Sequence, residues 1–229
     1  MTKTRRLVIV GAGETANLAY EYFTYDSEYE VVAFAVDPEY VGEGRFLDLP
    51  LVAIDKMGEL YPPEKVESFV AFGSGELNYQ RDRMCARVKA MGYRLASYVS
   101  SRAFVWRNVK IGENCFILED NTLQPFTEVG DDVVMWSGNH LGHQSKIGSH
   151  CFVTSHVVIS GFCSVGEHTF IGVNTSVADH TVIGADNFIA MGSAISGKTG
   201  DNEVWRGSPA RKQALPAKMF CGVSGTNEK

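Results

Sequence analysis

Residues 141–166 read LGHQSKIGSHCFVTSHVVISGFCSVG, and within them an aliphatic residue returns at every sixth position. The same register runs unbroken from Ile111 to Ile195, often with glycine directly after the aliphatic residue. The positions are Ile111, Ile117, Leu123, Val129, Met135, Leu141, Ile147, Val153, Ile159, Val165, Ile171, Val177, Ile183, Ile189 and Ile195. A period of six is neither helical nor a simple alternating strand, and it predicts a prism with three faces of short parallel strands.

Three hexads make one coil of about eighteen residues, so the array predicts about five coils. Weaker hexads at Val99 and Val105 move the expected start to about residue 99. Stacked coils bury their aliphatic residues only against neighbouring coils, which is why a long uninterrupted array is needed. We therefore expect a solenoid domain at 98–210, preceded by a separate domain at 1–97 and followed by a C-terminal tail at 211–229 that frays after Val223.

The first hundred residues have a different pattern, in which apolar strands alternate with helix-like segments. The expected strands are 7–10, 31–36 and 68–72, and the expected helices are 17–25 and 78–91. This alternation predicts an α/β, half-Rossmann-like domain with a small parallel sheet. Ligands of such sheets bind at the carboxyl ends of the strands.

The turn after the first strand carries a glycine pattern suited to a nucleotide. Gly11 permits a sharp turn, Gly13 permits close approach of the backbone, and the start of the following helix offers free N–H groups to a phosphate. Glu14, directly after Gly13, is also expected to bind substrate. Asp37 ends the second strand and could accept a hydrogen bond from a ribose or a base, while Gly73 follows the third strand. The alternative is a tight strand-to-helix turn with Asp37 as an ordinary strand-end residue.

About ninety-five residues hold only one mononucleotide-binding half, which is too little for a complete dinucleotide domain. The size therefore favours one nucleotide, such as the uridine or thymidine diphosphate of an activated sugar, over a nicotinamide cofactor.

The amino-acid composition restricts the classes of protein to which the chain can belong. The 229 residues are 45% hydrophobic and 21% charged, with no apolar stretch long enough to cross a membrane, and we expect a cytoplasmic protein. A formal charge of −6 without a Lys/Arg run disfavours a nucleic-acid surface. Cys115, Cys151 and Cys163 stand in the small-residue slot of the repeat, so we expect packing rather than disulfides or zinc ligation.

All six histidines lie in the solenoid. His143 occupies the third position of its hexad, and Gly161 comes eighteen residues later, one coil above it. An imidazole beside a glycine amide supplies a proton acceptor and an oxyanion donor, as acyl transfer requires.

The other corner histidines occupy the fourth position of their hexads: His150, His156, His168 and His180. His150 and His168 are eighteen residues apart, so we expect them to stack about 4.8 Å apart on adjacent coils. Polar stacking explains them without a function. A metal between such corners is possible, but the spacing alone does not specify one, and we predict no metal site.

The hexads resemble the left-handed parallel β-helix acyltransferases. Their combination with the N-terminal GAGETA turn resembles the bacterial sugar acetyltransferases of the PglD/NeuD type, typified by bacillosamine N-acetyltransferase and the sialic acid O-acetyltransferases. The element Gly207-Ser208-Pro209-Ala210-Arg211 is similar to one near the end of these solenoids. The resemblance implies acetyl-CoA-dependent N-acetylation of a UDP- or dTDP-linked deoxy amino sugar in bacterial surface glycan biosynthesis, without a metal.

The same resemblance implies residue roles. His143 matches the base, the Gly161 amide matches the contact to the thioester carbonyl, and His140 resembles a histidine near the acceptor. Relatives usually carry Asp or Glu directly after the base, where this chain has Gln144, so a less basic His143 is expected. Trp136 replaces a small polar residue and would belong to a different acceptor pocket.

For the CoA side, we expect the site to include Gly161 and residues of the last coils: Lys198, Arg206, Pro209 and Arg211. The hexads stop at Gly197–Glu203, which predicts a projecting loop. The resemblance implies a homotrimer with sites between subunits. The alternatives are O-acetylation of a sugar such as sialic acid, a non-catalytic nucleotide-sugar-binding solenoid, and a nicotinamide-dependent enzyme.

Overall fold

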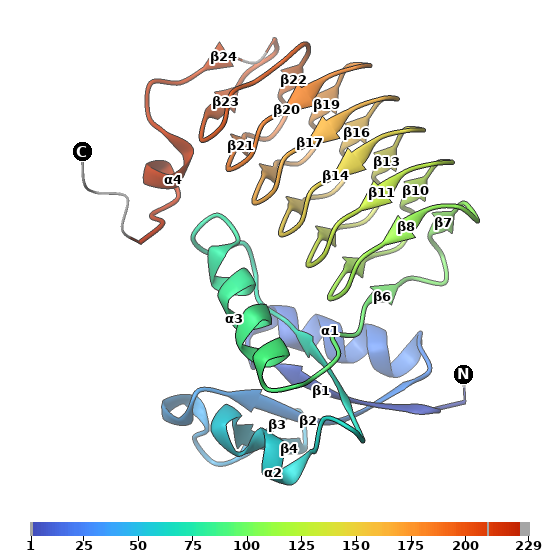
Figure 1. The fold of residues 1–229 in the computed structure, drawn as a ribbon, viewed down its shortest axis with the longest axis vertical. Coiled ribbons are helices and arrows are strands. Elements are labelled where there is room, and N and C mark those ends of the chain that lie inside the picture. Colours follow the sequence, from blue (N-terminus) through green and yellow to red (C-terminus); the bar gives the residue numbers. More distant parts are fainter. Residues whose placement is uncertain (1, 210, 225–229) are drawn as a thin grey trace.

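A computed structural model of the chain describes residues 2–209 and 211–224. It consists of an N-terminal α/β domain and a triangular solenoid that stands on it (Figure 1). No helix within these residues is long and apolar enough to span a bilayer.

The N-terminal domain is built on a five-stranded sheet of order β3-β4-β2-β1-β5. Its strands are β1 (Arg5–Val10), β2 (Tyr29–Val36), β3 (Arg45–Phe46), β4 (Leu49–Ala53) and β5 (Glu67–Val70). All pairings are parallel except the short hairpin of β3 with β4, which the sequence did not predict. The expected parallel sheet is otherwise confirmed.

Helices cover both faces of this sheet. They are α1 (Glu14–Tyr25), α2 (Met57–Leu60) and α3 (Tyr79–Ala90), with short 3-10 turns η1 (Pro38–Tyr40) and η2 (Ile54–Lys56). Helix α1 packs Ala16, Ala19 and Phe23 on one face, and α3 packs Met84 and Val88 on the other. The sheet is therefore buried on both sides, as its continuous apolar strands require.

The solenoid has three faces of two-residue parallel strands, and each strand pairs with the strand eighteen residues later. Face 1 contains β6 (Tyr98–Val99), β9 (Phe116–Ile117), β12 (Val134–Met135), β15 (Phe152–Val153), β18 (Phe170–Ile171), β21 (Phe188–Ile189) and the three-residue β23 (Val204–Arg206). Face 2 contains β7 (Phe104–Val105), β10 (Thr122–Leu123), β13 (His140–Leu141), β16 (Val158–Ile159), β19 (Ser176–Val177) and β22 (Ala194–Ile195). Face 3 contains β8 (Lys110–Ile111), β11 (Glu128–Val129), β14 (Lys146–Ile147), β17 (Ser164–Val165) and β20 (Val182–Ile183).

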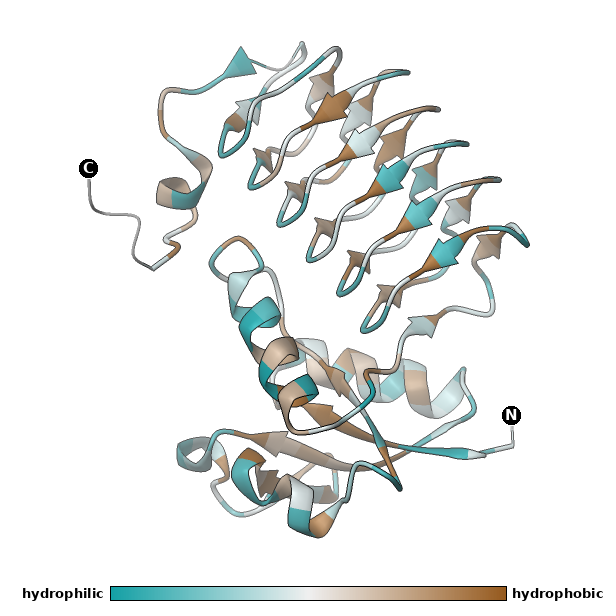
Figure 2. Ribbon diagram, in the orientation of Figure 1, coloured by the Kyte–Doolittle hydropathy of each residue, from teal (hydrophilic) through white to brown (hydrophobic). Residues whose placement is uncertain are grey.

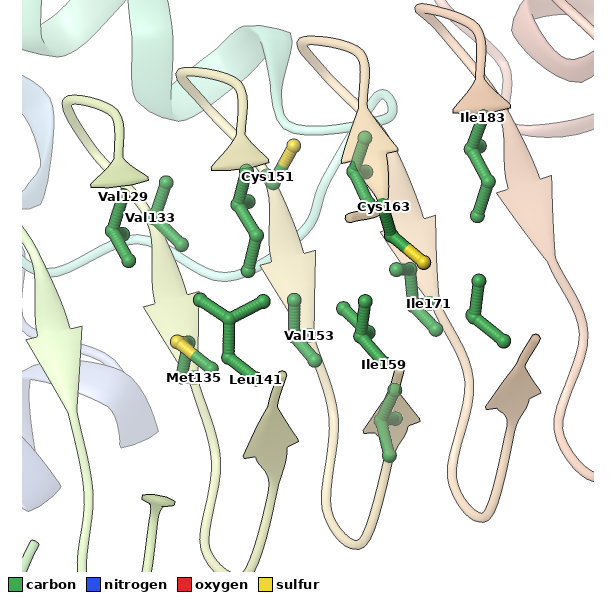
Figure 3. Close-up of a cluster of buried hydrophobic side chains, with 14 of the residues drawn as sticks. Val129, Val133, Met135, Leu141, Cys151, Val153, Ile159, Cys163, Ile171 and Ile183 are labelled. Atoms are coloured by element: carbon green, nitrogen blue, oxygen red, sulfur yellow. The ribbon is translucent and has the colours of Figure 1, made fainter. Parts of the chain in front are cut away.

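One side chain of each strand points inward and forms a continuous core (Figure 3). Leu141, Val153 and Ile159 lie in this ladder, and each is at most 1% exposed. The outward residues of face 3 are polar in the early coils, as the hydrophilic colours of β8, β11 and β14 show in Figure 2. The predicted hexad register is confirmed, and β6 pairs with β9 in the same register.

The corners between faces depend on residues in the left-handed region. His150, His156, His168 and His180 have φ of 61°, 58°, 53° and 58°. Such φ values cost a non-glycine residue some free energy. The corner placement predicted for these histidines is confirmed.

Face 1 is the side of the solenoid that receives the N-terminal domain. Its outward residues are largely aromatic, and Tyr98, Phe116, Val134 and Phe152 pack with Phe69 of β5 in one cluster. The Phe152, Phe170 and Phe188 rings stack up the face at centroid separations of 5.7 and 4.9 Å. The two parts of the chain therefore share a hydrophobic core.

A buried ion pair reinforces this junction. Arg81 of α3 is 1% exposed and donates from Nε to Asp132 Oδ1 at 2.8 Å. It also donates to the backbone carbonyls of Gly73 (3.1 Å), Asp132 (2.9 Å) and Cys151 (3.2 Å). Burial alone would raise the pKa of Asp132, but the Arg81 charge, with hydrogen bonds from His150 and Asn114, lowers that pKa and keeps the carboxyl ionised.

The end of the solenoid differs from expectation. Residues 197–203 do not project: Val182 donates to the Gly197 carbonyl, Thr199 is 3% exposed, and Asn202 donates to the Ala185 carbonyl. The prediction of a projecting loop was therefore wrong, because side-chain bonds from Asn187 replace the hexad pattern in closing this coil.

The segment that follows also has structure. Strand β24 (Arg211–Lys212) pairs antiparallel with β23, and helix α4 (Ala217–Phe220) packs Ala217 against Leu77 and Val204. The sequence predicted neither element. Ala210 of the predicted terminal motif, and most of the segment expected to fray after Val223, lie outside the described residues.

Candidate active site

The five N-terminal residues predicted to bind substrate lie around one cavity of about 710 Å³ at the carboxyl ends of β1, β2 and β5. They are Gly11, Gly13, Glu14, Asp37 and Gly73. All of the cavity's lining residues belong to the N-terminal domain, including Tyr40, Phe72 and Met84. The volume is in the range typical of small-ligand sites.

Two glycines shape the cavity floor in different ways. Gly11 has φ of 123°, and a Cβ there would lie 3.0 Å from the Ala71 carbonyl oxygen. Gly13 is the residue before α1, has φ of −102°, and has open space where a Cβ would stand. Gly11 is therefore required by the backbone, whereas Gly13 leaves room next to the free N–H groups at the helix start.

The cavity wall carries charge and aromatic surface that the sequence did not reveal. Asp37 forms an ion pair with Arg87 of α3, and Tyr40 is 69% exposed. A carboxylate beside a guanidinium offers an acceptor and a donor to a nucleobase or ribose, and the tyrosine offers a ring for stacking. Neither Arg87 nor Tyr40 follows a motif, so only the fold identifies them.

His143 lies at the corner between faces 2 and 3, at the start of an exposed turn. Its backbone N–H donates to Gln124 Oε1 at 2.9 Å, and its ring meets Phe162 edge-on with centroids 5.0 Å apart. A Cβ on Gly161 would lie 2.8 Å from both Cε1 and Nε2 of this ring. The imidazole therefore lies directly against the Gly161 backbone, in contact that only glycine permits.

The N–H groups at the position of Gly161 in other hexads fall into two kinds: some have a side-chain acceptor, and others, such as those of Ser149 and Glu167, have none within the described residues. The corresponding N–H of Glu113 donates to Asp131 Oδ1, and that of Asp131 donates to Ser149 Oγ. Within the described residues, the Gly161 N–H has no such acceptor. A donor without a partner beside an imidazole is the arrangement that can stabilise an oxyanion.

Asp179 is the residue of this corner that the sequence analysis missed. It follows Gly161 by eighteen residues, and its Oδ1 would lie 3.1 Å from the same Gly161 Cβ position that His143 approaches. Its other oxygen pairs with His180 Nε2 at 3.2 Å. Gln144, at φ of 63°, is exposed, and its side chain makes no hydrogen bond within the part of the chain described. The carboxylate near the histidine therefore comes from one coil above Gly161 and two coils above His143, and the eighteen-residue period could have indicated it.

The remaining predicted substrate residues do not gather at one point. His140 is half-buried on face 2, three residues before His143 on the same coil. Trp136 lies at the corner between faces 1 and 2 and packs against the cluster shared with the N-terminal domain. Within one chain, Trp136 and His143 therefore belong to different corners.

The predicted CoA-binding cations are also separated. Lys198 bridges to Val182 of face 3, next to the His143 corner. Arg206 and Arg211 pair across β23 and β24 at the end of face 1, and exposed Pro209 lies in the turn between them. None of the three cations forms an ion pair within residues 2–209 and 211–224, so their charges remain available to an anion.

The cysteines of the solenoid are unsuited to nucleophilic chemistry. Cys115, Cys151 and Cys163 are free thiols and are at most 2% exposed. Burial raises the pKa of Cys115 and that of Cys151 to about 12. A thiolate would therefore be scarce at neutral pH.

The cavity and His143 lie on different sides of the molecule. The N-terminal domain docks on face 1, whereas His143 lies at the corner of faces 2 and 3, opposite face 1. A single chain therefore does not bring its own cavity and its own histidine together.

No family model and no curated protein sequence matches the chain. Solved structures do resemble it. The acetyltransferase domain of PglB from Neisseria gonorrhoeae is 21% identical with a TM-score of 0.82, and the match covers 92% of this chain and 100% of that one. PerB from Caulobacter crescentus, solved with CoA and GDP-perosamine, is 22% identical with a TM-score of 0.82, covering 93% and 100%.

WeeI from Acinetobacter baumannii is more distant, with 15% identity and a TM-score of 0.57 over 92% of this chain and 100% of that one. These similarities show the fold: the chain is an α/β domain followed by a left-handed parallel β-helix, the architecture of the PglB acetyltransferase domain and of PerB.

Gly11→Ala tests the backbone requirement of the cavity. We expect it to lower the free energy of unfolding by about 1–3 kcal/mol, because alanine is strained at this φ and its Cβ meets the Ala71 carbonyl. Urea denaturation of Gly11→Ala beside the matched Gly13→Ser, which has room for its side chain and is expected to be neutral within about 0.5 kcal/mol, measures the difference. Equal stability of the two variants would contradict the assignment.

Proposed function

We propose that this protein is an acetyl-CoA-dependent N-acetyltransferase that acetylates the amino group of a nucleotide-linked amino sugar in bacterial surface glycan synthesis. The observation that carries the proposal is the contact of His143 with Gly161, whose amide has no acceptor among the described residues. The fold is shared over more than nine-tenths of the chain with the PglB acetyltransferase domain and with a perosamine N-acetyltransferase. The Caulobacter enzyme has also been solved with one histidine replaced by asparagine or alanine.

The nucleotide would occupy the N-terminal cavity. Its diphosphate would face the N–H groups at the start of α1, beyond Gly13, and its base or ribose would meet Asp37 and Arg87. The acyl donor would lie along the corner of faces 2 and 3, with Lys198 near its phosphates.

The transfer would be direct. The sugar amine attacks the thioester carbonyl while His143 takes its proton, and the Gly161 N–H stabilises the tetrahedral oxyanion. The C–S bond then breaks, and CoA leaves as a thiol with the proton that His143 returns. An acyl-enzyme is not needed, in keeping with the buried cysteines.

Asp179 would support His143 in place of the acid expected after the base. His143 belongs to the coil below Gly161 and Asp179 to the coil above it, and both side chains approach the position that a Cβ of Gly161 would occupy. A negative charge there favours the imidazolium that forms during transfer. The neutral Gln144 cannot provide it.

Two observations support a homotrimer whose sites are shared between subunits. The cavity and His143 of one chain lie on different sides of it, so the acceptor must come from another copy. The corner that bears His143 and the strands beside it also expose apolar side chains suited to burial: Trp106 (42%), Phe126 (58%) and Phe162 (48%) at the corner, Val158 (44%) on face 2 and Val182 (40%) on face 3. The proposal includes a cytoplasmic location, where CoA thioesters and nucleotide sugars are made.

His143→Ala tests the proposed base. Thiol release from acetyl-CoA would be followed with UDP-, dTDP- and GDP-linked amino sugars, and we expect one acceptor to be used and the variant to lower kcat by about 10²–10⁴. His156→Ala, at the corner of faces 1 and 2, is the control and should retain activity. Turnover that survives in His143→Ala would overturn the assignment, and turnover only with hydroxyl acceptors would replace N-transfer by O-transfer.

Asp179→Asn tests the supporting carboxylate. We expect a lower kcat with little change in KM, because a negative charge that favours the imidazolium formed during transfer is lost. Gln144→Glu in the same background should restore part of the rate by supplying a carboxylate beside the base. An unchanged kcat would show that Asp179 serves only its pairing with His180.

Subunit mixing tests the shared site. We expect His143→Ala and Asp37→Ala each to have low activity at low substrate concentration. When equal amounts of the two variants are unfolded, mixed and refolded together, the mixture should regain about one quarter of wild-type activity. This follows because each mixed cyclic trimer contains one intact site. Mixtures that regain nothing, although trimers form, would place the whole site within one chain.

A further inference from the structure

We propose that Asp82, His150 and His168 form a binding site for a zinc-like divalent cation between helix α3 and the solenoid. The three side chains come from α3 and from two successive coils, and one ligand atom from each lies within 4.8 Å of the others. This site is separate from His143 and from the N-terminal cavity, and it does not depend on the proposed acetyl transfer.

The carboxylate already faces both imidazoles. Asp82 Oδ2 lies 3.1 Å from His168 Nε2, and Asp82 Oδ1 lies 3.5 Å from His150 Nε2. Tetrahedral zinc, with ligand distances of about 2.0–2.2 Å, places its ligand atoms roughly 3.3 Å from one another. Each oxygen of Asp82 therefore lies at about this separation from one of the two imidazoles, and a small rotation of the carboxylate would bring one oxygen near both.

The two imidazoles are held side by side by the solenoid itself. Their ring centroids are 4.8 Å apart with an interplanar angle of 17°, which reflects the spacing of adjacent coils. The candidate ligand atoms lie within 4.8 Å of one another, so sharing a cation requires the two imidazole nitrogens to approach by no more than about 1.5 Å. One position would remain for water.

His150 has the outer partner that metal-bound histidines usually have. Its Nδ1 lies 3.0 Å from Asp132 Oδ2, and Asp132 is itself fixed by Arg81 and by Asn114 Nδ2, each at 2.8 Å. A carboxylate at Nδ1 keeps the proton on that nitrogen and leaves the Nε2 lone pair for a metal. The ring therefore presents its ligating atom toward Asp82.

His168 is oriented by stacking instead of by a hydrogen bond at Nδ1. Its ring lies between His150 and Tyr79, and the Tyr79 ring is parallel to it at 4.0 Å. Its Nδ1 is buried and has no partner within residues 2–209 and 211–224. Without a cation, the Asp82 carboxylate favours the proton on Nε2, so a bound cation would displace that proton and take its place between Nε2 and Asp82.

A cation can reach the site through a charged opening. A cavity of about 210 Å³ between α3 and the solenoid is lined by Asp82 and His150 together with Glu113, Asp131 and Asp132. Lys89 also lines it and pairs with Glu113. Two imidazoles and one carboxylate favour zinc over magnesium or calcium, which prefer oxygen ligands.

A cation bound at this site would cross-link the two domains. The ligands join α3 to coils that are 68 and 86 residues away along the chain. A cation bound only by the folded, docked state should stabilise that state.

The test is zinc binding by the full-length chain after dialysis against a chelator and then metal-free buffer. We expect about one zinc per chain by equilibrium dialysis with elemental analysis, a melting temperature that rises with zinc and falls with chelator, and no effect of magnesium. Asp82→Ala and His168→Gln should each weaken zinc binding at least tenfold. His180→Gln, at another corner and also next to an aspartate, is the matched control and should bind as the wild type does.

The wild-type titration decides the matter even if a variant fails to fold. The proposal would be wrong if substantially less than one zinc bound per chain, or if the melting temperature were the same in zinc and in chelator. The three side chains would then be joined by hydrogen bonds alone. Stoichiometric zinc that persists unchanged in both ligand variants would place the metal elsewhere and equally overturn the proposal.

Discussion

The inward aliphatic residues of the solenoid stack directly above one another, and this stacking determines where its other side chains lie. One strand pairs with the strand eighteen residues later, so Leu141 lies beside Leu123 and Ile159. A slip of one residue would expose all the inward aliphatic side chains to solvent. The free energy lost by that exposure fixes the register. Because the register is fixed, residues at equal positions of successive coils form columns. The contact of His143, Gly161 and Asp179 and the pairing of His150 with His168 both follow from such columns.

The outward side of face 1 shows how the same repeat also joins the two domains. Its aromatic residues continue the core of the N-terminal sheet, with Phe69 and Phe116 rings 5.4 Å apart. Apolar stacking alone would hold the domains without a unique orientation. The buried Arg81–Asp132 pair adds direction, since each member would be left as an uncompensated buried charge if the domains moved apart.

This docking has a functional consequence. It places the nucleotide-sized cavity on one side of the solenoid and His143 on the opposite corner, so the proposed reaction depends on assembly. The same docking brings Asp82 to the two stacked histidines, although that carboxylate belongs to a helix of the other domain. The histidines therefore lie in two different settings. His143 lies at an exposed corner, where we propose that it acts in acetyl transfer, whereas His150 and His168 lie at the corner that contacts helix α3 of the N-terminal domain.

The solenoid, its register, the α/β character of the first domain and the residues at the cavity floor are all predictable from the chain alone. They are predictable because hexads, strand ends and glycine turns are local or strictly periodic signals. The β3–β4 hairpin, the closure at residues 197–203 and helix α4 are not predictable in this way, because tertiary contacts form them. The same holds for the pairing of Arg87 with Asp37, the contact of Asp82 with His150 and the separation of Trp136 from His143. Those placements depend on how one domain or helix packs on another, and no spacing along the chain encodes that packing.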